Sequence, residues 1–188
     1  MILALYEPPA GLVTEARSQV VYDVGRGVAH LGPLRVEGPA LVWTLGAEDQ
    51  DFVAQSHEVL EPALRVEVEL DPRHDWVVRC DRVEFPPGGV AHRHVHPGPG
   101  IRRLLQGELT IDSPDGVHTY RTGEAWFEGV EHPVLATASV TEDTAFVRVL
   151  LLPAQWAGKR TIRYLDPADE EKPKLQRATV LLEEPLSP

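Results

Sequence analysis

The chain has 188 residues, of which 43% are hydrophobic and 25% charged, and its formal net charge is −11. This length suits one domain with a sizeable core, and the acidic balance argues against a nucleic-acid partner, which needs a basic surface. Cys80 is the only cysteine, which excludes an internal disulfide and is typical of a reducing compartment. The first residues lack the basic start of a signal peptide, and no run approaches the ~20 apolar residues of a membrane span. We therefore expect a cytoplasmic protein without membrane contact.

Short apolar and β-branched runs are separated by proline and glycine along the chain, which holds 17 prolines and 15 glycines. This punctuation is typical of all-β proteins. In the N-terminal part we expect strands at 19–24, 40–45 and 64–70, and the strict alternation of the last predicts a strand with one buried face. Residues 48–60 are the best helix candidate, because their apolar residues lie near one helical face and Pro62 ends the segment.

From residue 76 onward the chain predicts a run of antiparallel strands joined by short turns. Strands are expected at 76–85, in the histidine segment after Gly89, and at 101–112, 117–121, 125–127, 134–140 and 145–152. Asp115 and Gly116 mark a hairpin turn, because an Asp-Gly pair readily takes the positive φ angles of tight turns. Such a succession suits a jelly-roll barrel, and a single histidine cluster argues for one barrel.

The composition divides the chain into three parts of one structural domain. Residues 1–75 are expected to pack on or extend a barrel, residues 76–152 to form it, and residues 153–188 to form an extension with a final strand at 177–182. This final strand is expected to pair at a sheet edge or with another subunit, because an edge strand presents unpaired backbone groups. We therefore expect a homodimer.

The segment 88–107, GGVAHRHVHPGPGIRRLLQG, carries the clearest chemical signal. His92, His94 and His96 occupy every second position, and side chains two apart in a strand point to the same face. An apolar core does not tolerate three unpaired imidazoles, because burying an unsatisfied ring nitrogen is costly. Three imidazoles on one face before a turn can instead converge on a metal.

This spacing resembles the first motif of the cupin family. That motif is a glycine, five residues, a His-x-His pair, three or four residues, a glutamate, six residues and a glycine. Gly88, His94, His96 and Gly107 occupy the matching positions. The glutamate position falls on Gly100, so one of the usual metal ligands is missing.

The second cupin motif is matched in part by Gly123, Gly129 and His132. Its usual proline and asparagine positions fall on Phe127 and Ala136, and the segment is about two residues short. The resemblance covers roughly residues 76–152. It implies an all-β fold of the cupin type, which is a double-stranded β-helix or jelly-roll barrel, here with N- and C-terminal extensions.

The resemblance implies a metal site in which His94 and His96 from one strand meet His132 from another. Three imidazoles suit a divalent transition metal such as Fe, Ni, Zn or Mn and leave positions open for water or substrate. His92 either replaces the missing carboxylate as a fourth ligand or lies at the barrel mouth beyond reach of the metal. Glu128 and Glu131 lie near His132 in the sequence and could supply an oxygen ligand, but we expect both to be solvated.

Two arginines follow the histidine strand, and only one of them can face inward. The motif phase places Arg102 in the cavity and Arg103 outside. An inward Arg102 would orient an anionic substrate through its forked donors and act as the catalytic residue, whereas an arginine in a surface ion pair is the alternative. Arg148, in an otherwise apolar strand, raises the same question.

The cupin resemblance suggests a metal-dependent enzyme acting on a small, anionic molecule. The first hypothesis is a dioxygenase-type oxidoreductase, and isomerase or decarboxylase activity are the other enzymatic hypotheses. The alternative is a non-catalytic cupin that binds a small ligand or a metal. The missing glutamate and asparagine favour this alternative. A metal-free structural or dimerisation barrel is the third hypothesis.

Overall fold

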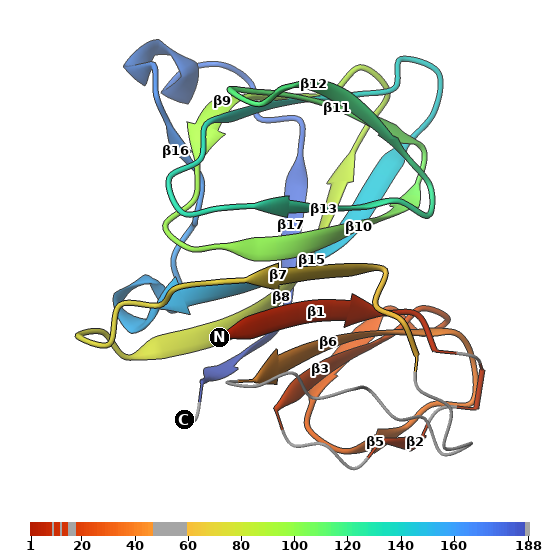
Figure 1. The fold of residues 1–188 in the computed structure, drawn as a ribbon. Helices are drawn as coiled ribbons and strands as arrows, with labels where there is room; N and C mark the ends of the chain where they lie inside the picture. The colour runs from red at the N-terminus through yellow and green to blue at the C-terminus, as the bar shows by residue number, and fades with distance from the viewer. Residues whose placement is uncertain (9, 12, 15–17, 47–59, 187–188) are drawn as a thin grey trace.

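The computed structural model describes residues 1–8, 10–11, 13–14, 18–46 and 60–186. In these residues the protein is almost entirely β-sheet, as predicted (Figure 1). The helix expected at 48–60 lies, apart from Leu60, outside the described residues. The two helical turns of the described part are short, and no described helix is long and apolar enough to cross a membrane.

The strands fall into three groups along the chain. The N-terminal group is β1 (Ile2–Tyr6), β2 (Val13–Thr14), β3 (Gln19–Asp23), β4 (Val28–Leu31), β5 (Leu34–Arg35), β6 (Ala40–Gly46) and β7 (Leu64–Glu67). The middle group is β8 (Trp76–Phe85), β9 (Val90–Val95), β10 (Gly100–Gln106), β11 (Glu108–Ser113), β12 (Gly116–Arg121), β13 (Ala125–Glu128), β14 (Val134–Ala138) and β15 (Thr144–Pro153). The C-terminal group is η1 (Ala154–Trp156), β16 (Arg163–Tyr164), η2 (Pro167–Glu170) and β17 (Arg177–Pro185).

The middle group forms a barrel of two facing sheets. One sheet has the order β13-β10-β15-β8 and the other has the order β12-β11-β14-β9. Consecutive strands β8 and β9 therefore lie in opposite sheets, and the last strand, β15, returns beside the first. This alternation between sheets is the strand order of a jelly roll. The predicted fold class is confirmed.

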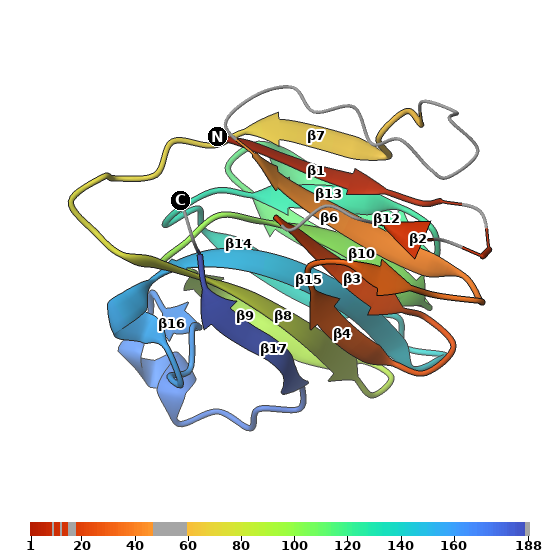
Figure 2. The same cartoon turned by 90° about the horizontal axis from the view of Figure 1, so that it is seen from below.

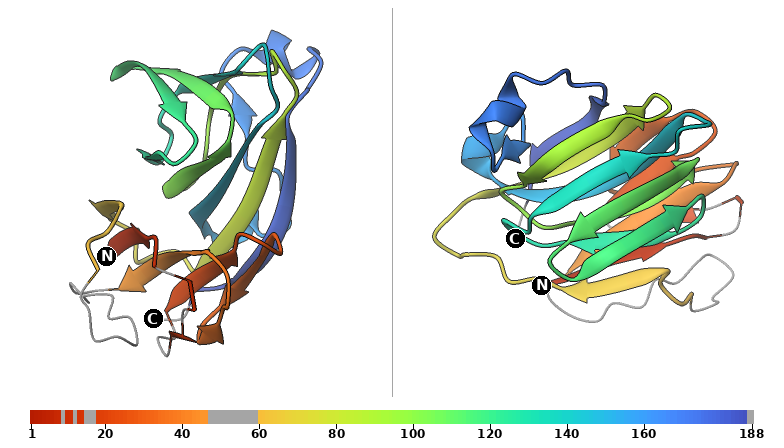
Figure 3. Two further views of the ribbon diagram at one scale, coloured as in Figure 1. Left: turned by 90° about the vertical axis from the view of Figure 1, so that its right-hand side faces the viewer. Right: turned by 90° about the horizontal axis from the view of Figure 1, so that it is seen from above.

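The N-terminal strands form a further sheet, of order β4-β3-β6-β1-β7, which covers the outer face of the β8 sheet (Figure 3). Leu5, Tyr22 and Trp43 from this sheet share one buried cluster with Cys80 and Val149 from the barrel. Every residue of β15 is buried, because the N-terminal sheet covers one of its faces and the barrel interior the other. Alternate side chains of the barrel strands thus point into two different hydrophobic cores, one between the sheets of the barrel and one under the N-terminal sheet.

The C-terminal strand extends the same barrel sheet within the chain. Strand β17 pairs antiparallel with β8, placing Ala178 opposite Val83 and Glu183 opposite Arg79 (Figure 2). Of the two pairings expected for this strand, the sheet edge is the one formed. The homodimer stays a prediction that this strand does not support.

Two glycine positions explain where the predicted strands end. The strand expected at 101–112 is divided at Gly107, whose φ of 76° is a left-handed conformation that favours glycine. The predicted hairpin at Asp115 and Gly116 is confirmed, since it joins β11 to β12 and Gly116 has a φ of 123°.

Candidate functional site

The barrel encloses a cavity of about 620 Å³ between its two sheets. Its apolar wall includes Phe85, Leu109, Ile111, Trp126, Val134 and Phe146. Its polar end is built from β8, β9, β10, β13 and β15, and residues of the C-terminal extension also line the cavity. This combination of a large apolar wall and a few converging polar groups is typical of a small-molecule site.

His94 and His96 line this cavity, but His92 does not. The reason is a β-bulge in β9: Ala136 and Val134 of β14 pair with Ala91 and His94, so two steps on β14 span three on β9. The extra residue interrupts the period of two. His92 is therefore half-buried outside the cavity, and of the two predicted placements the ligand role is not supported.

Both cavity histidines have a defined proton position. His94 Nδ1 lies 2.7 Å from the carbonyl oxygen of His92, and His96 Nδ1 lies 3.1 Å from that of Thr161. A carbonyl oxygen only accepts, so each Nδ1 carries the proton and each Nε2 is left with a lone pair. Burial lowers the pKa of His94 to about 4 and lowers that of His96 well below its usual value, so both rings are neutral at pH 7.

The lone pair of His96 is occupied by an arginine. Arg148 Nη1 donates to His96 Nε2 at 3.2 Å, and Arg148 Nη2 donates to the Thr161 hydroxyl at 3.4 Å. Asp81 balances the charge of Arg148, with its Oδ2 3.0 Å from Nε and 2.9 Å from Nη2. Arg148 therefore faces the barrel interior, which answers the question that the sequence left open.

Arg102 lies in the cavity with only 1% of its surface exposed, on the inward face predicted for it. Its Nη2 is 2.7 Å from Glu128 Oε2, an ion pair without hydrogen-bond alignment, and its Nη1 donates to the Gly100 carbonyl at 2.6 Å. Burial lowers the pKa of Arg102 to about 10, which leaves it charged at neutral pH. Arg103 lies outside and forms an ion pair with Glu7.

Glu128 was expected to be solvated, and that expectation is wrong. Its side chain is buried, and its Oε1 accepts the Trp126 indole N–H at 2.8 Å. Burial acts to raise the pKa of Glu128, but the Arg102 guanidinium and the Trp126 hydrogen bond outweigh it and hold the pKa below its usual value. Glu128 is therefore an ionised partner of Arg102.

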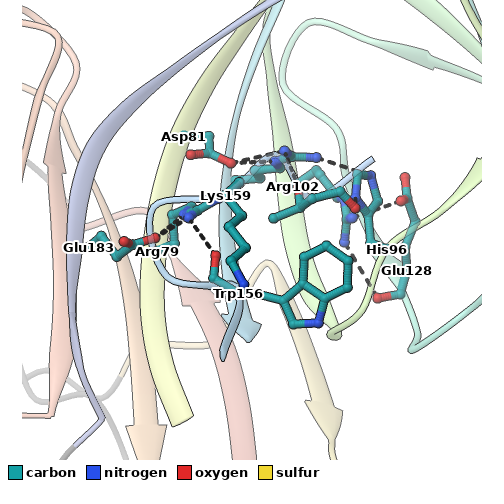
Figure 4. A network of polar contacts seen from close by, with 10 residues as sticks. Arg79, Asp81, His96, Arg102, Glu128, Trp156, Lys159 and Glu183 are labelled. Carbon is teal, nitrogen blue, oxygen red and sulfur yellow. Dashed lines mark hydrogen bonds and ion pairs between the residues drawn. The ribbon is translucent and has the colours of Figure 1, made fainter. Parts of the chain in front are cut away.

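A third buried arginine joins the C-terminal extension to the barrel. Arg79 forms an ion pair with Glu183 of β17 and donates to the carbonyl oxygens of Lys159 at 2.8 Å and Trp156 at 3.2 Å (Figure 4). Sequence reasoning missed Arg79, Asp81 and Glu183. The available signal was the period of two in β8, which places Arg79 and Asp81 on the same face as the cavity residue Val83.

His132 does not join the histidine pair. It lines a smaller neighbouring cavity, and its Nε2 is 3.4 Å from Asp115 Oδ2 in the hairpin turn. Glu131, immediately before it, has a φ of 54°, a left-handed conformation that interrupts the extended chain. The alternation of inward and outward side chains in β14 therefore does not extend from Val134 back to His132. The predicted cluster of His132 with His94 and His96 is not formed.

The donors at this site do not fit the predicted metal. In the part of the chain that the structure describes, no group of three or more His, Cys, Asp or Glu side chains is arranged to hold a metal ion. Gly100 offers no carboxylate, and the guanidinium of Arg148 occupies His96 Nε2, the lone pair that a metal would use. A permanently charged arginine at that atom opposes a second cation.

Comparison with known proteins gives similarity only at the level of solved structures, since no family model and no curated protein matches. The polyketide cyclase RemF from Streptomyces resistomycificus is 19% identical over 51% of this chain and 64% of its own, with a TM-score of 0.39. An oxalate oxidase in complex with glycolate is 21% identical over 42% of this chain and 47% of its own, with a TM-score of 0.36. An RmlC-like cupin from Shewanella frigidimarina is 15% identical over 44% and 69%, with a TM-score of 0.37. The matched regions span less than two thirds of the first two of these structures.

The class of protein follows from the fold itself. The eight strands of the middle group form a jelly-roll barrel, and strand β9 places His94 and His96 at its interior cavity. Within this barrel the polar end contains two neutral histidines and three arginine–carboxylate ion pairs.

Proposed function

We propose that this chain is a cupin-type protein that binds a small molecule in its barrel cavity without a metal on the histidine pair. One observation carries the proposal: Arg148 Nη1 lies 3.2 Å from His96 Nε2. The guanidinium therefore uses the imidazole lone pair that would otherwise bind a metal. The alternative of a metal-dependent dioxygenase, isomerase or decarboxylase lacks the donors in the described residues.

The ligand that suits this cavity has an apolar body and a hydrogen-bonding end. Buried charges are balanced, because Arg79, Arg102 and Arg148 each contact one carboxylate. The charge of Arg102, predicted to hold an anionic substrate, is already balanced by Glu128, and its Nη1 donates to the Gly100 carbonyl. A neutral polar end is therefore favoured over an anionic one, since burying another charge there needs its own partner.

A metal-loading experiment tests the first half of the proposal. The purified full chain is incubated separately with Fe²⁺, Ni²⁺, Zn²⁺ or Mn²⁺, dialysed, and analysed for metal by mass spectrometry. We expect far less than one metal per chain, and the same residual content in His94→Ala. A content of one metal per chain that is lost in His94→Ala would contradict the proposal and favour a metal-dependent protein.

A binding experiment tests the second half by fluorescence titration with 2-naphthol, a probe that has an apolar body and one hydroxyl group. Ala136 lines the cavity from β14, and Thr137 is the next residue on the same strand and is not part of the cavity lining. Ala136→Trp should abolish binding by filling the cavity, whereas Thr137→Trp should retain it. Equal binding to both variants, or no binding to the wild-type chain, would contradict a ligand site in the barrel.

A further inference from the structure

We propose that His94 Nε2 selects the ligand of this cavity, by accepting a hydrogen bond from a hydroxyl or N–H group at the polar end of an otherwise apolar molecule. This inference rests on the proposed function and goes further, because it names the chemical class of the ligand and the atom that recognises it.

The first step is the orientation of the ring. His94 Nδ1 lies 2.7 Å from the carbonyl oxygen of His92, its neighbour across the bulge of β9. This contact fixes both the rotation of the ring and the position of its proton, because the carbonyl can only accept. Nε2 is consequently an acceptor and cannot donate to a ligand.

The second step is that this acceptor is free. No residue in the described part of the chain forms a hydrogen bond with His94 Nε2, and this nitrogen atom is not fully buried. The ring itself lines the cavity. The atom therefore has access to the cavity, where a ligand donor can meet it.

The third step is the contrast with His96, whose ring has the same proton position. Its Nε2 accepts from Arg148, and Arg148 is held in turn by Asp81. The two rings lie 5.0 Å apart and nearly perpendicular. Since the lone pair of His96 is satisfied internally, a ligand hydroxyl at this end of the cavity would find its acceptor on His94.

A site with a buried acceptor rejects analogues that lack the matching donor, because the acceptor is then left unpaired. The apolar cavity wall carries Trp126 and Phe146, whose rings are in edge-to-face contact with centroids 5.3 Å apart. Aromatic walls and one free acceptor together favour a phenol-like or heteroaromatic N–H compound. Three probes of matched body isolate the donor: 2-naphthol, 2-methoxynaphthalene and naphthalene.

The experiment measures the dissociation constants of these three probes for the full chain at pH 7 by fluorescence titration. We expect 2-naphthol to bind about fivefold tighter than 2-methoxynaphthalene, as one net hydrogen bond would give. His94→Leu should remove this preference and keep the affinity for naphthalene, and the retained affinity shows that the cavity is intact. His92→Leu is the matched control, because this side chain lies on the same strand outside the cavity.

A second variant guards against a folding defect in His94→Leu. His94→Gln keeps an acceptor oxygen on the side chain and should restore part of the preference for 2-naphthol. A preference that persists unchanged in His94→Leu, or a wild-type chain that binds naphthalene and 2-naphthol equally, would overturn the inference while leaving the cavity as a ligand site. If none of the probes binds the wild-type chain, the proposed function itself fails.

Discussion

Arg148 and His96 form a direct contact inside the barrel, with the guanidinium Nη1 3.2 Å from the imidazole Nε2. The contact is a charge-assisted hydrogen bond, because arginine keeps its charge and its donors at all physiological pH values. Burial first, and then the charge of Arg148, lower the pKa of His96. Asp81 completes the arrangement by balancing the arginine.

Arg148→Met should destabilise the protein strongly. The substitution leaves Asp81, which is 1% exposed, as an uncompensated buried charge, and breaking such a pair costs about 3–5 kcal/mol. The free energy of unfolding from urea denaturation measures the effect. Removing both charges in Asp81→Leu/Arg148→Met should recover much of the loss, because no unpaired charge is then buried.

The exposed pair of Arg73 and Asp71 supplies the control for this prediction. Arg73 is 84% exposed at its side chain, so Arg73→Met should leave the unfolding transition nearly unchanged. If Arg148→Met were as mild as Arg73→Met, the buried pair would not have the structural role assigned to it.

Gly100→Glu restores the carboxylate that the cupin motif expects, and it should disrupt the barrel rather than create a metal site. A Cβ atom at Gly100 would press against the carbonyl oxygen of Val149 and the side chain of Leu150 on the neighbouring strand. Backbone atoms cannot yield cheaply, so we expect a loss of stability of about 3 kcal/mol or more. Thermal unfolding measures it.

Gly38→Ala is the matched control, because nothing lies within 4 Å of the Cβ that it adds. It should shift the melting temperature little. A Gly100→Glu chain that folds normally and takes up one zinc per chain would show that the glycine, and not Arg148, prevents metal binding.

Local patterns were enough to predict much of this fold. The alternation of residues 64–70 predicted β7, although this strand ends at Glu67. The Asp-Gly pair predicted the β11–β12 hairpin, and β8 begins and ends at the predicted residues. The phase of the cupin motif also placed Arg102 inward and Arg103 outward, and it holds because β10 is regular as far as Leu104. The alternation of residues predicts which way a side chain points wherever a strand contains no bulge.

The site was predicted poorly for the same reason. The bulge in β9 turns His92 away, and the left-handed Glu131 separates His132 from the phase of β14. The bulge in β9 has no glycine or proline to mark it, whereas Gly129 and Pro133 flank Glu131 and His132 and indicate a turn there. Arg79 and Glu183 are more than 100 residues apart in the chain, so only the tertiary pairing of β8 with β17 brings them together.

Glu183→Ala should loosen the C-terminal strand from the barrel. Glu183 binds the guanidinium of Arg79 and accepts the Gly158 N–H at 2.7 Å, so it joins β17 to both β8 and the segment that follows η1. Removing it leaves Arg79, only 3% exposed, without its counter-charge. We expect a loss of about 3 kcal/mol in unfolding free energy and faster hydrogen exchange in β17.

Glu184→Ala tests whether this effect belongs to Glu183. Glu184 is the next residue of β17 and is exposed, so its removal should change the unfolding free energy by less than about 0.5 kcal/mol. Similar hydrogen exchange of β17 in the two variants would contradict the proposed anchor.

The stability of the protein should fall in mild acid because of its buried histidines. Burial lowers the pKa of His94 from 6.5 to about 4 against the opposing charge of Glu128, while Arg148 and Arg102 lower it further. Between these two pH values the unfolded chain binds a proton that the folded chain does not, so stability decreases as the pH falls. His94 alone accounts for about 2 kcal/mol between pH 7.5 and pH 5, and His96 acts in the same direction.

Urea denaturation at pH 7.5 and pH 5 measures this dependence in the wild-type chain, in His94→Gln and in His30→Gln. Glutamine does not titrate, so His94→Gln should lose less stability on acidification than the wild type does. His30 is exposed, and its replacement should leave the pH dependence unchanged. Parallel curves for all three chains would mean that His94 is protonated as readily in the folded barrel as in the unfolded chain, which is incompatible with a buried neutral ring whose Nε2 is an acceptor.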